Sequence, residues 1–130
     1  MSMRLLLDTQ IALWALTGSK RLGKAAGDLI EDPANEVFVS SATVWEIAIK
    51  YALGRGGMPV SGTRAGALFG QAGYRELPVS WRHAAAVDGL PDIHADPFDR
   101  ILLAQAMSEP MRLLSRDATV VRYGSVVLAV

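Results

Sequence analysis

Residues 4–16 read RLLLDTQIALWAL, and this stretch decides the fold class. The apolar run at residues 5–7 stops at Asp8, which is typical of a short strand buried on both faces. Residues 9–16 are nearly all apolar and predict a short helix directly after this strand. A buried strand that leads at once into a helix favours an α/β protein with a parallel sheet.

The same alternation continues along the rest of the chain. Apolar runs predict further strands at residues 37–39, 76–79, 111–114 and 125–129. Helical patterns lie at residues 20–31, 40–53, 80–88 and 97–109. Between residues 62 and 73, glycines three or four apart predict a closely packed helix. We therefore expect a three-layer α/β/α sandwich with a short, mainly parallel central sheet, formed as a single domain by residues 1–130.

The composition excludes several classes of site. Thirteen basic and 13 acidic residues give no net charge, which argues against a broad footprint for duplex nucleic acid. The absence of cysteine excludes a disulfide scaffold and a thiolate metal site, and the two histidines, His83 and His94, supply few nitrogen ligands. No apolar run approaches the ~20 residues of a membrane span, and no signal peptide is recognised, so we expect a cytoplasmic protein without a membrane partner.

Acidic residues stand at the ends of several predicted strands and at the starts of several helices. They are Asp8, Glu46, Asp96, Asp99 and Asp117. Each has an ordinary explanation as a helix cap or as a charge that suits a helix N-terminus. Asp96, for example, precedes a proline as an N-cap does, and Glu46 follows Thr43 at capping-box spacing.

Four of these acids are also expected to converge at one edge of the sheet. Asp8 and Asp117 follow strands, and Glu46 and Asp99 lie in helices next to strand ends, where ligands bind in open parallel sheets. Two carboxylates ~4 Å apart repel by about 4 kcal/mol at an effective dielectric of ~20, so the group needs shared protons or a cation. Oxygen ligands without cysteine select Mg²⁺ or Mn²⁺. Such ions handle phosphate, so the sequence predicts metal-dependent phosphoryl-transfer or phosphodiester chemistry.

Four segments, in order, are LLLDTQIALWAL (residues 5–16), SSATVWEIAIKYALGRG (40–56), HADPFDRILLAQA (94–106) and LLSRDATVVRYG (113–124). Together they resemble PIN-domain ribonucleases, and most closely the VapC-type toxins of bacterial toxin–antitoxin pairs. The likeness extends from residue 4 to about residue 127. One such motif is weak on its own, but four in this order within one short chain are fairly specific.

The resemblance assigns roles residue by residue. The positions that match the four family acids are Asp8, Glu46, Asp99 and Asp117. The first three correspond to the usual metal-binding core, and the fourth is more variable. Thr9 resembles the small hydroxyl residue beside the first acid, where it would hold a carboxylate or a water. Asp96 belongs to the DPFD form of the third motif, and we expect it mainly as an N-cap; His94 matches no family role, and we expect a loop residue.

The resemblance also implies an activity. It is that of an endoribonuclease that uses Mg²⁺ or Mn²⁺ to cut single-stranded or loop RNA, as the toxin of a type II pair. Basic candidates for the RNA backbone are Lys50, Arg100 and Arg116. Lys50 could equally pair with Glu46 along a helix, and Arg100 could lie on a solvated face. The alternative function is a PIN-like module that binds RNA or protein without cutting.

Partners follow from the same resemblance. A VapB-type antitoxin would hold the protein inactive, with a C-terminal segment lying along a groove near the site. The apolar residues that could form this groove, or a homodimer face, are Ile11, Trp14, Leu16 and Trp45. Packing in the core explains these residues equally well.

Overall fold

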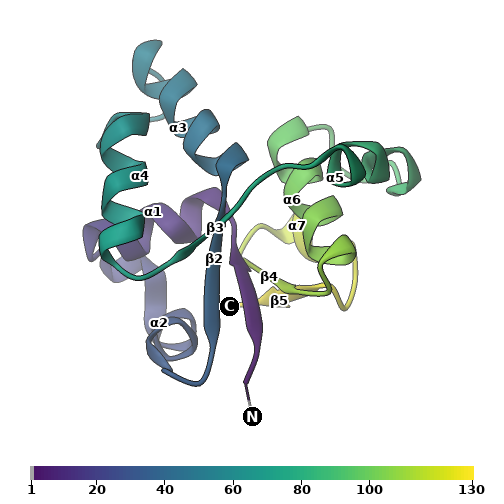
Figure 1. The fold of residues 1–130 in the computed structure, drawn as a ribbon, viewed down its shortest axis with the longest axis horizontal. Helices are drawn as coiled ribbons and strands as arrows, with labels where there is room; N and C mark the ends of the chain where they lie inside the picture. The colour runs from purple at the N-terminus through teal and green to yellow at the C-terminus, as the bar shows by residue number, and fades with distance from the viewer. Residues whose placement is uncertain (1) are drawn as a thin grey trace.

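The computed structural model describes residues 2–130, and its strands form one parallel sheet (Figure 1). The strands are β1 (Arg4–Leu7), β2 (Glu36–Ser40), β3 (Arg75–Leu77), β4 (Arg112–Ser115) and β5 (Val127–Ala129). Their order across the sheet is β3-β2-β1-β4-β5, and every neighbouring pair is parallel. Because the chain winds outward from β1 in both directions, the carboxyl end of β1 is the place where an open sheet binds ligands.

Helices cover both faces of this sheet (Figure 1). On one side lie α1 (Thr9–Thr17), α2 (Gly23–Glu31), α3 (Ser41–Ala52) and α4 (Gly62–Gln71). On the other side lie α5 (Trp81–Ala86), α6 (Pro97–Ser108) and α7 (Ala118–Val121). Two short 3-10 turns, η1 (Lys20–Leu22) and η2 (Val87–Gly89), complete the chain. The predicted three-layer sandwich is confirmed, and no helix within residues 2–130 is long and apolar enough to cross a membrane.

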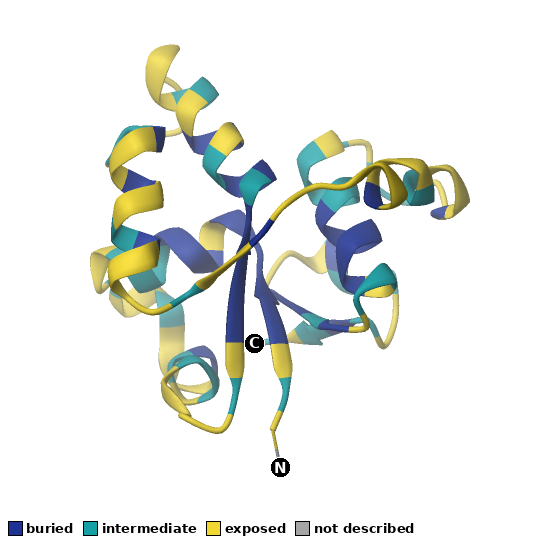
Figure 2. Cartoon of the chain, in the orientation of Figure 1, coloured by how far each residue is buried: buried dark blue, intermediate teal, exposed yellow. Residues whose placement is uncertain are grey.

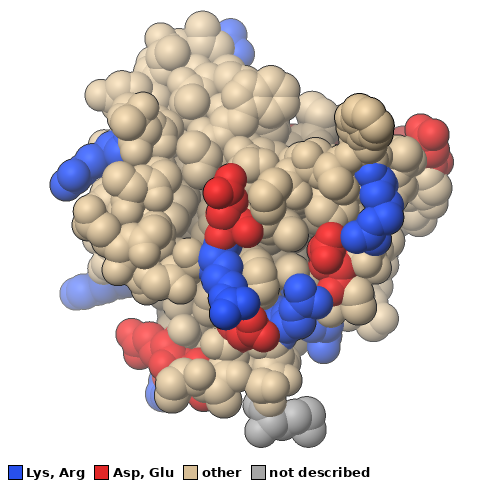
Figure 3. Space-filling view, viewed as in Figure 1, with Lys and Arg blue, Asp and Glu red and all other residues tan. Residues whose placement is uncertain are grey.

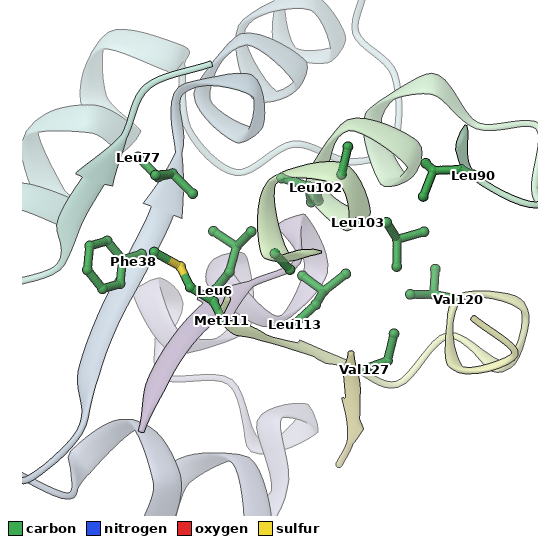
Figure 4. Packing of buried hydrophobic residues seen from close by; sticks show 12 residues of the cluster. Leu6, Phe38, Leu77, Leu90, Leu102, Leu103, Met111, Leu113, Val120 and Val127 are labelled. Carbon is green, nitrogen blue, oxygen red and sulfur yellow. The ribbon is translucent and has the colours of Figure 1, made fainter. Parts of the chain in front are cut away.

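The first strand is buried on both faces, as its apolar run predicts. Leu5 and Leu7 pack into the cluster beneath α1 and α4, whereas Leu6 points to the opposite cluster beneath α6. All three leucines are fully buried, and β1 and β2 are dark blue over most of their length in Figure 2. Figure 4 shows Leu6 among the side chains of the second cluster, including Leu102 and Leu113. Burial of each leucine stabilises the fold by about 1.5–3 kcal/mol. The sheet is therefore a stable support for the residues at the carboxyl ends of its strands.

Two helix starts differ from the sequence prediction. Residues 20–31 form η1 and then α2 rather than one helix, because Gly23 interrupts the helical turn at φ 79°. The helix predicted from residue 40 begins at Ser41, where Ser40 Oγ accepts a hydrogen bond from the Ala42 N–H at 3.0 Å. The capping box expected from Thr43 and Glu46 is therefore wrong, since both residues lie inside α3.

The predicted close packing at the glycines is confirmed for the start of α4. A Cβ atom added at Gly62 would lie 2.6 Å from the Cβ of Ala48 on α3. The same addition at Gly70 would meet nothing within 4 Å. Gly73 has another function, because it adopts φ 85° in the turn before β3. The absence of a side chain thus serves packing at one end of α4 and turn formation after the other.

Candidate metal centre

The acids expected to converge line one pocket beyond the carboxyl ends of β1 and β4. Its volume is about 400 Å³, and its acidic lining consists of Asp8, Glu46, Asp96, Asp99 and Asp117. Thr9, Lys50 and Arg116 line the same pocket. The structure therefore brings together every residue of the sequence-predicted site except Arg100.

Asp8 is placed by the end of β1 and the start of α1. Its backbone N–H continues the ladder to the Leu114 carbonyl at 3.1 Å, and its Oδ1 accepts from the Ile11 N–H at 2.8 Å. The side chain is an N-cap and is 6% exposed. Burial raises the pKa of Asp8, and the neighbouring charges of Asp117 and Glu46 add to the increase, whereas hydrogen bonds from Ser115 and Ile11 oppose it. The negative charge of ionised Asp8 is therefore only partly stabilised by the surrounding protein groups.

Glu46 is the second buried carboxylate and is also 6% exposed. Its Oε1 accepts a hydrogen bond from Thr9 Oγ1 at 2.7 Å, and its Oε2 lies 2.5 Å from Lys50 Nζ. Thr9 thus holds a carboxylate in the way that the resemblance implies. The expected helix pair of Lys50 and Glu46 is present, and it places one positive charge on the wall of the pocket.

Asp96 and Asp99 belong to the start of α6. Asp96 Oδ1 accepts from the N–H groups of Phe98 at 2.8 Å and Asp99 at 3.4 Å, so the predicted N-cap is confirmed. Burial, followed by the charge of Asp96, raises the pKa of Asp99 to about 6. Asp8 adds to this shift, and the hydrogen bond with His94 opposes it. A carboxyl with this pKa exchanges its proton near neutrality, where a cation can replace it.

Asp117 lies opposite these residues as the N-cap of α7. Its Oδ1 accepts from the N–H groups of Thr119 at 2.8 Å and Val120 at 3.3 Å. Asp117 is exposed, unlike Asp8 and Glu46. Asp117 therefore lies on the solvent-exposed side of the acidic cluster.

His94 lies in the loop before α6, as expected, but its side chain also contacts the acidic cluster, which the sequence did not predict. Its Nε2 lies 2.8 Å from Asp99 Oδ2. His94, Asp99 and Asp117 each offer one ligand atom, and these atoms all lie within 4.8 Å of one another. The signal in the sequence was that His94 begins the same HADPFD segment as Asp99, but a spacing of five residues across a loop does not predict contact.

Arg100 has partners other than the predicted phosphate or solvent. Its Nη1 donates to the carbonyls of Pro91 at 3.1 Å and His94 at 3.3 Å, and its Nη2 to the carbonyl of Val87 at 3.4 Å. Arg100 does not line the pocket. It holds the loop before α6, because three carbonyls of one segment converge on its guanidinium.

Arg116 lines the pocket, but its guanidinium is also committed to the protein. Nε donates to the carbonyl of Val130 at 3.0 Å, Nη2 to that of Leu22 at 2.6 Å, and Nη1 to that of Arg21. The guanidinium carbon lies 5.1 Å from the ring centre of Trp14. The phosphate contact expected for Arg116 would have to compete with these bonds.

The donor set suits a hard divalent cation. Carboxylate oxygens dominate it, one imidazole lies beside them, and the chain has no sulfur ligand from cysteine. Burial is the main cause of the raised pKa values of Asp8 and Asp99, and the charges of neighbouring carboxylates add to this imbalance against the ionised forms. A divalent cation held by Asp8, Glu46, Asp99 and Asp117 would remove this imbalance.

Comparison with known proteins adds the family. A family model described as the PIN domain matches residues 5–125. The chain belongs to the PIN domain family. This confirms the family indicated by the four sequence motifs, and no curated protein matches the sequence significantly.

Solved structures with the same PIN fold come from several bacteria. VapBC2 from Rickettsia felis, bound to a DNA fragment from its promoter, has a TM-score of 0.69 at 13% identity, covering 98% of this chain and 97% of that one. A toxin–antitoxin complex from Klebsiella pneumoniae has a TM-score of 0.67 at 18% identity, covering 96% of each chain. VapC20 from Mycobacterium tuberculosis, described as a sarcin–ricin loop cleaving toxin, has a TM-score of 0.64 at 18% identity, covering 92% and 95%. At these identities the similarity establishes the fold.

The apolar residues of this PIN domain divide between core and surface. Ile11 is fully buried in the core and also lines the acidic pocket. Trp14 and Leu16 are half-buried beside the core. Trp45 is 63% exposed, and its ring meets that of Phe98 edge-on at 5.4 Å between centres. Trp45 is therefore the most exposed member of the set.

Proposed function

We propose that this PIN domain is an endoribonuclease that depends on Mg²⁺ or Mn²⁺. The observation that carries the proposal is the convergence of Asp8, Glu46, Asp99 and Asp117 on one pocket, with the pKa values of Asp8 and Asp99 raised. A bound divalent cation would polarise a phosphoryl oxygen and lower the pKa of its bound water. The carboxylates would hold the cation, and they are the residues we propose as catalytic.

The surrounding residues would fix the geometry that such chemistry needs. The N-cap bonds of Asp8 and Asp117 and the Thr9 hydroxyl hold three carboxylates in single orientations. Lys50, on the wall of the same pocket, supplies the positive charge closest to Glu46. We propose single-stranded or loop RNA as the substrate, because a chain with no net charge lacks the broad basic surface that duplex binding uses.

We also propose that the protein is the toxin of a type II toxin–antitoxin pair in the cytoplasm, with a VapB-type antitoxin as partner. Among the similar solved structures, the one from K. pneumoniae is described as a toxin–antitoxin complex, and the one from R. felis as VapBC2 bound to DNA from its promoter. A second cavity of about 260 Å³ shares Gln10, Leu13 and Trp14 with the acidic pocket. Because they share these residues of α1, the two cavities are adjacent, and we propose that an extended antitoxin segment occupies both.

A homodimer completes the proposal. A mostly apolar cavity of about 550 Å³ lies between α3 and α6, with Trp45, Val79, Phe98 and Ile101 in its lining. Trp45 and Val79 are exposed large apolar residues, and exposed apolar patches mark interaction sites. A second copy of the chain is the occupant that we propose for this surface.

The test is cleavage of a mixture of transfer and ribosomal RNA, with Mg²⁺ and with a chelator. We expect the wild type to cut in Mg²⁺ only, and Asp99→Asn to lose cleavage. Asp92→Asn, which removes an exposed acid from the preceding loop, is the matched control and should cut like the wild type. RNA binding without cleavage by the wild type would favour the non-catalytic binding module. Undiminished cutting in the chelator would contradict the metal dependence.

A further inference from the structure

The loop that carries His94 is fixed from two sides. The His94 N–H donates to Tyr123 Oη at 2.9 Å, and Tyr123 Oη donates to the Pro91 carbonyl at 3.1 Å. From α6, Arg100 Nη1 donates to the carbonyls of Pro91 and His94. These bonds tie the loop to the segment after α7 and to α6, so the backbone of His94 has a set position before any ligand arrives.

The imidazole of His94 contacts Asp99, one of the acids that line the pocket, although His94 itself is not part of the lining. Its Nε2 lies 2.8 Å from Asp99 Oδ2, and a ligand atom of Asp117 completes a group with all separations within 4.8 Å. Adjacent ligands of one octahedral ion lie about 3 Å apart and opposite ligands about 4.2 Å apart, for metal–ligand distances of about 2.1 Å. The side chains of His94 and Asp99 are 22% and 21% exposed, so both are accessible to an ion from solvent. The His94–Asp99 separation equals that of adjacent ligands, and the limit of 4.8 Å leaves Asp117 close enough to reach the same cation with a small side-chain movement.

The other histidine shows what a structural histidine–carboxylate pair looks like in this chain. His83 Nε2 lies 2.5 Å from Glu109 Oε2, and its Nδ1 accepts the Ser80 N–H at 3.1 Å. His83 is buried, and both ring nitrogens serve the start of α5 and its contact with the end of α6. Within the described residues, no third ligand joins this pair, whereas Asp117 joins His94 and Asp99.

We propose that His94 is a direct nitrogen ligand of the divalent cation, beside Asp99 and Asp117, and that it shifts the metal preference from Mg²⁺ toward Mn²⁺. This inference rests on the proposed function, because it concerns the same cation site. Mg²⁺ prefers oxygen ligands and gives up its water reluctantly, whereas transition-metal ions accept imidazole readily. One imidazole in a carboxylate site therefore stabilises bound Mn²⁺ more than bound Mg²⁺.

The experiment uses Mn²⁺ as a paramagnetic probe bound to the intact chain. Pulsed electron paramagnetic resonance detects the modulation from a directly coordinated ¹⁴N nucleus. We expect this modulation in the wild type and in Asp92→Asn, and its loss in His94→Asn. Calorimetric titration should show about a tenfold or greater loss of Mn²⁺ affinity in His94→Asn, with Mg²⁺ affinity changed by less than about threefold.

Labelling with ¹⁵N-histidine makes the test independent of the variant's folding. In wild-type protein with labelled imidazoles, the ¹⁴N modulation should be replaced by the ¹⁵N pattern. Mn²⁺ bound without nitrogen coupling would overturn the inference and reduce His94 to a hydrogen-bond partner of Asp99, while the proposed metal dependence would stand. Wild-type protein that binds neither Mn²⁺ nor Mg²⁺ would overturn both proposals.

Discussion

Asp8 uses one carboxylate for two purposes that conflict. As the N-cap of α1 it satisfies the Ile11 N–H, which stabilises the helix start. As a buried charge near Asp117 and Glu46 it is unfavourable when ionised, which is why its pKa is raised. The proposed cation would resolve the conflict without removing the cap.

This conflict predicts a pH-dependent gain in stability for Asp8→Asn in metal-free protein. The pKa of Asp8 in the folded protein lies above its unfolded value of 3.8. At a pH between these two pKa values, the folded state therefore binds more protons than the unfolded state. Stability is therefore lost as the pH rises through the folded pKa, and asparagine removes this loss while still capping. Urea unfolding should show an advantage of Asp8→Asn that grows from pH 4 to pH 8. Asp8→Ala also lacks the cap, so its free energy of unfolding should be about 1 kcal/mol lower than that of Asp8→Asn at every pH. An advantage of Asp8→Asn over the wild type that is independent of pH would contradict the raised pKa of Asp8.

Asp99 predicts the pH range of metal stabilisation. Its pKa of about 6 means that a proton competes with the cation below this pH. Saturating Mg²⁺, at ~100 times its dissociation constant, should raise the free energy of unfolding by about 2.7 kcal/mol at pH 8, and this gain should be lost as the pH falls through 6. Thermal denaturation with and without Mg²⁺ measures it. An equal gain at pH 5, or an undiminished gain in Asp99→Asn, would show that Mg²⁺ binds elsewhere.

The sequence predicted the acids better than their neighbours. Asp8 and Asp117 could be placed because each follows a buried strand, and the ends of parallel strands meet at one edge. His94, Arg100 and Arg116 could not, because their contacts depend on the path of a loop or on partners far along the chain. Arg116, for example, binds the carbonyl of Leu22, 94 residues away. Local patterns carry no information on such contacts.

At the scale of elements, short apolar runs and helix starts were enough to predict the layers. The errors arose where two local signals competed. At the start of α3, both Ser40 and Thr43 could cap, and Ser40 does so because it is the last residue of β2. In the segment before α2, Gly23 takes a positive φ that breaks a helical pattern otherwise continuous in composition. Propensity alone does not decide either case.

The contact between α3 and α4 predicts opposite effects for two similar substitutions. Gly62→Ala would place a Cβ atom 2.6 Å from that of Ala48, and we expect a loss of about 1–3 kcal/mol in the free energy of unfolding. Gly70→Ala adds the same methyl group to open space in the same helix, and we expect a gain of about 0.5–1 kcal/mol. Chemical denaturation of both variants tests the packing. Equal effects would mean that α3 and α4 are not in close contact at Gly62.

At the scale of the whole molecule, charged side chains are spread over the surface, whereas exposed apolar side chains such as Trp45 lie at particular places. On the face drawn in Figure 3, basic and acidic side chains are interspersed over a mostly uncharged surface. This agrees with the lack of net charge and points to recognition by a small site rather than by a broad electrostatic field. The exposed ring of Trp45 is the local feature that an association between copies would use.

Trp45→Glu tests the proposed dimer. A charge placed in the apolar cavity between α3 and α6 should separate the copies, because a buried unpaired carboxylate is costly. Sedimentation should show a dimer for the wild type and a monomer for Trp45→Glu. Trp81→Glu is the control, since Trp81 is 94% exposed and does not line this cavity. A wild-type monomer, or an unchanged mass in Trp45→Glu, would contradict the proposal.

Arg116 joins parts of the molecule that would otherwise move separately. Its guanidinium binds the Val130 carbonyl beyond the short edge strand β5, and the Val130 N–H returns to the Ser115 carbonyl at 3.2 Å. Local unfolding of β5 would therefore loosen the turn that carries Asp117. We therefore expect local opening of β5 to limit how long the proposed metal ligands keep one arrangement.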